Sequence, residues 1–218
     1  MTTQNAKVTK TLQAIEAALI KLVRTKGLQK ITVADITKAA HINRGTFYLH
    51  YLDKEDLVDR TEAELFDGVD AILGRYIYEP MSQLAFLDES KDLLREVVTA
   101  VGKYALTGQR FALVQALSGP QGDPYFRNRG KELLRKYLAI TPNEQTANGI
   151  AGQVVQEFII QGLIDIVLTW FQQQPEQASA DELVQLIIDT RFLSPYALLK
   201  QLRPTEVEKN GHVTEVDF

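Results

Sequence analysis

Cysteine is absent from the 218 residues, so disulfide bonds and thiolate chemistry are excluded. Residues 1–11 contain no apolar segment that could form the core of a secretion signal. The longest apolar run, residues 158–171, has 14 residues and includes Asp165. Because this run is too short and too interrupted to span a bilayer, we expect it to form a buried helix. The sequence therefore predicts a cytoplasmic protein with no membrane partner.

Residues arranged for catalysis or for metal binding are also missing. The three histidines, His41, His50 and His212, are not at the spacing of metal ligands. The sequence has no G-x-S-x-G motif and no H-E-x-x-H motif. Segment 119–124 holds two glycines, but it has neither the spacing nor the lysine of a phosphate-binding loop. We therefore expect no enzymatic activity, no bound metal and no cofactor.

Acidic residues are scarce at the N-terminal end of the chain. Residues 1–52 hold eight Lys and Arg against two acidic residues, Glu16 and Asp35, which gives a net charge of +6. The remainder carries −10, and the whole chain −4. A basic end on an acidic body is typical of a protein that contacts phosphates with one end only. The alternative is a chance cluster of solvated lysines.

Apolar residues recur at helical spacing and no convincing strand pattern is present, so the sequence predicts an all-α fold. The first helix, 7–26, ends at Gly27. The second, 32–40, opens with a capping box formed by Thr32 and Asp35. The third, 44–51, is capped by Asn43. A long connecting helix, 53–79, begins at Asp53 and ends before a proline, and further helices are expected at 89–106, 110–117, 124–139, 143–173 and 180–202.

The third predicted helix has two different faces. Phe47 and Tyr51 are four residues apart, so both rings lie on one face and can anchor the helix in a core. Polar tips from Arg44, Thr46 and Tyr48 lie largely on the other face. A short helix of this design, following another short helix after a tight turn, is what DNA-reading helix-turn-helix units place in the major groove.

The sequence R-G-T-F-Y-x-H-Y-x-x-K at residues 44–54 resembles the helix-turn-helix of the TetR family of bacterial transcriptional regulators. The similarity extends over about residues 7–59, and the rest of the chain matches in helical pattern only. One departure is His41, which stands where the turn of the family commonly carries Gly. Histidine tolerates left-handed backbone better than most residues, so the turn is still expected.

The resemblance implies that side chains around the third helix contact DNA. Arg44 would reach guanine or a phosphate. Gly45 would allow close backbone approach to DNA, or is a permissive turn residue. His50 would be a phosphate partner or a structural hydrogen-bonding residue. Lys54 lies at a helix start, where a cation is unfavourable, and a phosphate would explain it. The expected DNA-binding residues are Thr32, Asn43, Arg44, Gly45, Thr46, Tyr48, His50 and Lys54.

The C-terminal body is expected to dimerise and to bind a ligand. Residues 150–171 are apolar most of the way round a helix, which predicts burial on both sides. The resemblance implies a dimer through the last two helices, and the alternative is an intrachain core. Its expected interface is Val155, Ile159, Gly162, Ile166, Leu186 and Leu193. Aromatic residues in mid-helix would line an effector cavity, or would only fill the core. They are Tyr104, Phe111, Tyr137, Phe158 and Trp170.

Together the residues and the resemblance predict three parts: a helix-turn-helix domain at 1–52, a helical regulatory and dimerisation domain at 53–202, and a frayed tail at 203–218. As the resemblance implies, the expected function is that of a homodimeric repressor. A mostly apolar or neutral small molecule would release it from a palindromic operator in double-stranded DNA. The alternative is a DNA-binding regulator that is controlled by a protein partner or that has no effector.

Overall fold

The computed structural model describes residues 3–77, 90–137, 150–173 and 180–192. Within these ranges every regular element is a helix, which confirms the all-α prediction. The first four are α1 (Thr3–Lys26), the single-turn η1 (Leu28–Lys30), α2 (Val33–Ala39) and α3 (Arg44–Tyr48). The others are α4 (Lys54–Tyr76), α6 (Ser90–Ala105), α7 (Arg110–Ser118), α8 (Phe126–Tyr137), α9 (Ile150–Gln173) and α10 (Ala180–Phe192).

Local capping determines where the N-terminal helices begin. The Thr32 hydroxyl accepts a hydrogen bond from the backbone N–H of Asp35, and the Asp35 carboxylate accepts one from the backbone of Thr32. The Asn43 side chain accepts a bond of 2.7 Å from the backbone of Thr46. These contacts confirm the predicted capping box and the predicted cap of the third helix. In the turn between α2 and α3, His41 has φ 55°, the left-handed conformation for which Gly is usual.

Helix α3 is shorter than the sequence pattern predicts. It ends at Tyr48 rather than at residue 51. The carbonyl of Phe47 accepts from the backbone of both His50 and Tyr51, so the chain tightens into a turn after Leu49. Phe47 itself is fully buried, and its ring centroid lies 5.6 Å from that of Tyr51. The predicted aromatic anchor is therefore present, although one of its two rings lies just beyond the helix.

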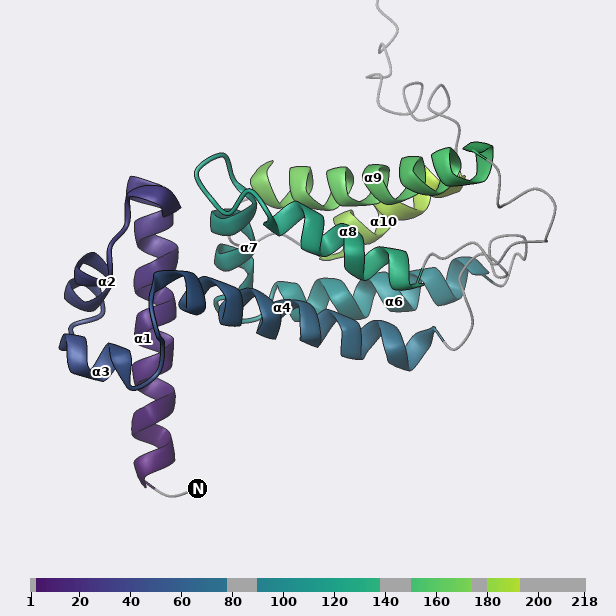
Figure 1. The fold of residues 1–218 in the computed structure, drawn as a ribbon. Coiled ribbons are helices and arrows are strands. Elements are labelled where there is room, and N and C mark those ends of the chain that lie inside the picture. Colours follow the sequence, from purple (N-terminus) through teal and green to yellow (C-terminus); the bar gives the residue numbers. More distant parts are fainter. Residues whose placement is uncertain (1–2, 78–89, 138–149, 174–179, 193–218) are drawn as a thin grey trace, which may run out of the picture.

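Helix α4 begins at the N-terminal helices and extends along the body (Figure 1). The Asp53 side chain caps it by accepting from the backbone of Asp56 at 2.7 Å. Its buried stripe includes Leu57, Leu65 and Leu73. The predicted end of α4 at residue 80 lies outside the described residues. So do residues 143–149, the predicted beginning of the helix that corresponds to α9, and the predicted tail at 203–218.

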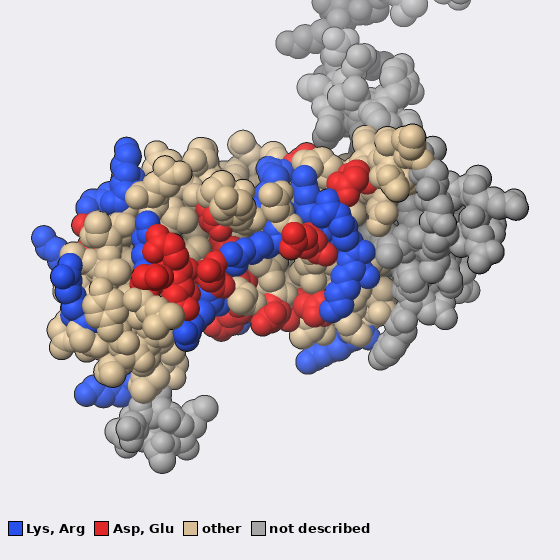
Figure 2. Space-filling model, viewed as in Figure 1, with Lys and Arg blue, Asp and Glu red and all other residues tan. Residues whose placement is uncertain are grey.

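Helix α8 lies between α4 and α9 and is joined to both by ion pairs. On the α4 side its partners are Asp59, Glu62 and Asp70, and on the α9 side they are Glu157 and Asp165. In Figure 2 a band of blue side chains accordingly crosses the body among red ones. These pairs are largely exposed, so each contributes little by itself, but together they fix the register of three helices.

The N-terminal helices are packed against the body as well as connected to it by α4. Helix α1 lies beside α7, and both stand across the direction of α4 and α9 (Figure 1). The Arg24 guanidinium donates to the side chain of Gln115 on α7, and the Leu28 backbone N–H donates to the carbonyl of Gln121 at 2.8 Å. A single apolar core runs from α1 through α7 to α9. The helices on the two sides of the predicted domain boundary near residue 52 therefore pack against one another.

Candidate nucleic-acid interface and internal cavity

The outer face of α3 presents exposed side chains on a firmly anchored helix. Arg44, Gly45 and Tyr48 are exposed, whereas Phe47 points into the core and meets the Tyr48 ring edge-on at 5.6 Å between centroids. Among the described residues, Arg44 has no ion pair or hydrogen-bond partner for its side chain. Figure 2 shows blue side chains over the end of the molecule formed by α1–α3. This arrangement leaves a cation and a phenol available to a partner outside the chain.

Three of the polar residues predicted to contact DNA are engaged in capping. The Asn43 side chain accepts from both the backbone and the hydroxyl of Thr46, the latter at 3.0 Å. The Thr32 hydroxyl donates to Asp35 at 2.9 Å. Lys26 and Thr32 together lower the pKa of the Asp35 carboxyl to about 2, which keeps this cap ionised at neutral pH. These residues place the helix, and Thr32 and Asn43 remain on the exposed surface.

Lys54 has a partner within the protein. Its side chain is 17% exposed, and the ammonium donates to the carbonyl of Leu28 at 3.1 Å and lies 3.4 Å from Glu55. The carbonyl and the carboxylate offset the unfavourable position of a cation at a helix start. A phosphate is therefore not needed to explain Lys54, although an ammonium has three donors and could still contact one.

Of two further residues predicted to contact DNA, Gly45 lies on the outer face of α3 and His50 does not. The half-buried His50 lines a polar cleft between α1 and α4, beside Tyr51 and Arg60, rather than the outer face of α3. Gly45 has no left-handed backbone, so the turn does not require glycine there. An added Cβ at Gly45 would meet only the Asn43 side chain, at 3.3 Å. The open space outside Gly45 leaves close approach of a partner as the better interpretation.

Sequence reasoning overlooked two exposed leucines on this surface. Leu49 is 81% exposed and Leu52 is 75% exposed, next to Tyr48 in the turn after α3. Neither leucine belongs to the apolar stripe that anchors α3. Their position off this stripe could have predicted from the sequence that they are exposed. Large apolar side chains beside a cation are suited to contact the methyl group of thymine in the major groove.

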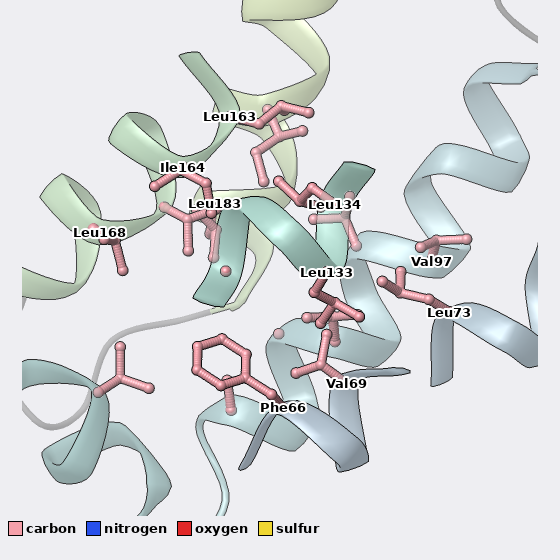
Figure 3. A pocket seen from close by; sticks show the side chains of 18 of the residues that line it. Phe66, Val69, Leu73, Val97, Leu133, Leu134, Leu163, Ile164, Leu168 and Leu183 are labelled. Carbon is pink, nitrogen blue, oxygen red and sulfur yellow. The ribbon is translucent and has the colours of Figure 1, made fainter. Parts of the chain in front are cut away.

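The body contains a cavity of about 200 Å³, partly open to solvent, that is lined by α4, α6, α7, α8, α9 and α10 (Figure 3). Its wall is almost entirely apolar. The labelled side chains that face it are Phe66, Val69, Leu73, Val97, Leu133, Leu134, Leu163, Ile164, Leu168 and Leu183. Two polar residues also line it, Arg127 and Tyr137, and both are paired within the protein. Arg127 pairs with Asp165, and the Tyr137 hydroxyl donates to the Asp70 carboxylate at 2.6 Å.

The segment that contains the helix-turn-helix unit is similar to a known family. Residues 15–61, from α1 to the first turns of α4, match the family model described as bacterial regulatory proteins, tetR family. The matched segment contains the whole helix-turn-helix unit and the exposed face of α3. This segment carries the helix-turn-helix of the TetR family, which is a family of bacterial regulatory proteins.

A further comparison extends the similarity over most of the chain. A curated relative, the uncharacterized HTH-type transcriptional regulator YxbF of Bacillus subtilis (strain 168), is 21% identical over 202 residues. The match covers 91% of this chain but 50% of that relative, so the chain spans about half the length of the relative.

Two solved structures have folds similar to that of this chain. A TetR transcriptional regulator from Streptococcus agalactiae 2603V has 24% identity and a TM-score of 0.55, covering 85% of this chain and 95% of that one. PfmR from Thermus thermophilus, a TetR family regulator, has 17% identity and a TM-score of 0.52, covering 81% of this chain and 96% of that one.

The cavity wall contains few of the residues that were predicted to line an effector pocket. Of the five predicted aromatic residues only Tyr137 lines this cavity. Phe111 and Trp170 are buried in the core beside Phe171, each at 5.3 Å between centroids. Tyr104 instead donates to the carbonyl of Glu64 on α4. Phe158 is 75% exposed on α9. The rings that do line the cavity, those of Phe66, Phe126 and Phe171, were not among the predicted residues, and most of the wall is aliphatic.

The outer face of α9 is apolar and uncovered in the single chain. Val154, Val155 and Phe158 are exposed, and an added Cβ at Gly162 would meet nothing within 4 Å. Of the predicted interface residues, Ile159, Ile166 and Leu186 are half-buried and also pack against the core. Leu193 lies outside the described residues. Two of the six, Val155 and Gly162, thus face away from the body.

The apolar character of α9 also corrects the argument against a membrane span. Gly152–Gln173 has 22 residues and a mean hydropathy of 1.5, so by length and composition this helix is able to cross a bilayer. The shorter run counted from the sequence underestimated it. Ile160, Ile164 and Leu168 are nonetheless buried against neighbouring helices, and Asp165 on the same helix pairs with Arg127. A buried core helix passes the same test of length and composition.

Proposed function

We propose that this chain is a TetR-family regulator, a cytoplasmic repressor that binds a palindromic operator as a homodimer and leaves it when a small apolar molecule occupies the cavity. The proposal is carried by one observation. An apolar cavity lies against α4, the helix whose first turn is bonded through Lys54 to Leu28, between α1 and α2. Cavities between helices that are lined mainly by apolar side chains are typical ligand sites.

DNA contact is proposed for the outer face of α3 and the residues around it. Arg44 and Tyr48 are exposed there and free to meet base edges or phosphates. Thr32, Asn43, Gly45 and Thr46 would lie close to the backbone of the duplex. Lys54 would contact a phosphate at the edge of the site while keeping its bond to Leu28. His50, which faces the cleft beside α1, is the weakest member of the predicted set.

Dimerisation is proposed through the outer face of α9, with α10 beside it. Val154, Val155 and Phe158 would lose their contact with water, and Gly162 would allow a partner helix to approach closely. A two-fold dimer uses the same patch on both chains, so one exposed apolar face on each chain is enough to form the interface. It would also place two copies of α3 at half-sites about 34 Å apart, as palindromic recognition requires.

The switch would act through α4. Phe66, Val69 and Leu73 on this helix face the cavity, so a ligand that enlarges the cavity must displace α4. Lys54, in the first turn of α4, holds the carbonyl of Leu28 and would transmit the displacement to η1 and α2. The effector must bind the released state more tightly by the coupling energy, typically about 1–3 kcal/mol. The cavity favours this mechanism over control by a protein partner.

The test combines footprinting with a ligand screen. Purified protein should protect a palindromic site upstream of its own or an adjacent gene, and affinity should fall steeply with salt because bound phosphates release counterions. A triple variant with alanine at Arg44, Tyr48 and Lys54 should lose protection. Operator release by apolar compounds should accompany a change in Trp170 fluorescence. Protection that persists in the triple variant would refute the DNA interface, and an inducer that is an anionic metabolite would refute the apolar effector.

A further inference from the structure

The cavity is long for its volume. On α4 its lining runs from Leu65 to Ile77, and a rise of 1.5 Å per residue makes this span about 18 Å. On α8 the lining runs from Phe126 to Tyr137, which corresponds to about 16 Å. Both ends of α8 therefore border the same cavity, which extends along the helices rather than forming a rounded chamber.

The cavity is also narrow. A volume of about 200 Å³ spread over about 18 Å corresponds to a passage roughly 6–7 Å across once the radius of a water molecule is included. Such a passage admits one hydrocarbon chain but not two side by side. Its volume lies below the range of about 300–1,000 Å³ that is usual for drug-sized ligands. A fused-ring molecule would have to push apart α4, α8 and α9, which the ion pairs of α8 hold in register.

The chemistry of the wall restricts the ligand further. Hydrocarbon surrounds the passage, and the guanidinium of Arg127 and the hydroxyl of Tyr137 are already bonded to Asp165 and Asp70. A charged head group would find no unpaired partner among the described residues that line the passage. Burying it there would be costly.

We infer that the effector of this regulator is a single unbranched hydrocarbon chain that ends in a small uncharged polar group, such as a long-chain alcohol. The inference rests on the proposed function, because it names the ligand class of the same cavity. Each methylene added to the chain should tighten binding about fourfold while the chain is shorter than the passage. Affinity should stop rising once the chain exceeds that length.

The test uses two alcohols that differ in shape at equal carbon number. Full-length protein is titrated with dodecan-1-ol and with cyclododecanol, and binding is followed by calorimetry and by Trp170 fluorescence. The linear alcohol should bind at least tenfold more tightly than the ring. A series of shorter and longer linear alcohols gives the increment per methylene and the length at which it ends. Dodecanoate tests the charge and should bind more weakly than the alcohol.

Variants place the bound chain in this cavity. Val69→Phe puts a ring into the middle of the passage and should shift the optimum to shorter alcohols. Val8→Phe makes the same substitution at an exposed position on α1, outside the cavity, and should leave the binding of the alcohol series unchanged. Should Val69→Phe fail to fold, Gly130→Ala is the second variant. Its Cβ would lie 3.0 Å from Ile164 and 3.7 Å from Phe66, so it narrows the passage slightly and should weaken long chains selectively.

The outcomes separate this inference from the proposed function. Equal binding of dodecan-1-ol and cyclododecanol overturns the inference about shape, while operator release by either one leaves the proposed repressor intact. Tight binding of linear alcohols without operator release supports the ligand class and refutes the switch. Failure of every alcohol to bind overturns the inference, and the wider screen for operator release then decides the switch separately.

Discussion

Glu62 offers a quantitative test of the packing between α4 and α8. Its side chain is 0% exposed, and Arg129 approaches it at 3.2 Å without the geometry of a hydrogen bond. Arg129 is also bound to Asp59, and Asp123 adds a second negative charge near Glu62. Burial, followed by repulsion from Asp123, raises the pKa of Glu62 from an ordinary 4.5 to about 8. The folded protein should therefore hold this carboxyl in its neutral form at pH 7.

The raised pKa has a definite consequence for stability. Below pH 4.5 both the folded and the unfolded chain hold the proton on Glu62. Between pH 4.5 and about 8 the unfolded chain releases it while the folded chain retains it, so the free energy of unfolding falls as pH rises. The slope for one proton is about 1.4 kcal/mol per pH unit. From about pH 5 to about pH 7.5 this group alone should cost about 3 kcal/mol.

The assay compares wild type with Glu62→Gln, because glutamine keeps the shape of the neutral carboxyl and cannot ionise. Urea unfolding at the two pH values gives the free energy of unfolding of each protein, at one fixed concentration because association adds to stability. The gain in stability of Glu62→Gln over wild type should be about 3 kcal/mol larger at the higher pH. Subtracting the change in stability at the lower pH from that at the higher pH cancels the contribution of all other titrating groups, because both proteins contain them.

The control is Glu96→Gln at an exposed position on α6, for which the same difference should be close to zero. One result would refute the reasoning. If the ion pair with Arg129 kept Glu62 charged, Glu62→Gln would lower stability at both pH values by a similar amount. The buried carboxylate would then be a stabilising partner rather than a neutral group.

Three further predictions concern other parts of the molecule. Arg44→Ala should weaken binding to a specific operator by about 1–3 kcal/mol in a gel-shift titration, and an equal loss on random DNA would contradict base recognition. Gly162→Leu should shift the protein towards monomers in sedimentation and weaken operator binding with it; a wild-type protein that sediments as a monomer at micromolar concentration would exclude the dimer. Gly122→Ala should lower stability by about 1–3 kcal/mol in thermal unfolding, because its Cβ would lie 2.1 Å from the backbone carbonyl of Leu117, and an unchanged midpoint would mean that the loop shifts freely.

Features that depend on a few neighbouring residues were predictable from the sequence. The capping box at Thr32 and the caps at Asn43 and Asp53 each need only a side chain and the backbone three residues on, so the pattern determines the contact. The left-handed turn at His41 was expected from the resemblance to the TetR family, in which the turn commonly carries Gly at this place. The helix bounds in the body followed from apolar periodicity to within a few residues where the structure describes them.

Features that depend on packing between distant helices were not predictable in this way. Phe111 and Phe158 look alike in the sequence, yet one is buried beside Phe171 and the other is exposed on α9. Which residues face a cavity depends on where helices fail to fill space, and periodicity does not contain that information. Glu62 did leave a signal, because it lies four residues after Val58 and three before Leu65 on the buried stripe.

The packing of α1 on α7 limits how chimeric regulators can be built from this chain and another regulator. A chimera cut near residue 52 would carry Arg24 and Leu28 without Gln115 and Gln121, and would place α1 on a foreign α7. The transplanted unit would still contain its recognition helix, but the surface that positions it would be mismatched. A working exchange should therefore transfer α7 and the loop that follows it together with α1–α3, so the exchangeable module is discontinuous in the chain. In related proteins, we accordingly expect substitutions at the contacting positions of α1 and α7 to occur together.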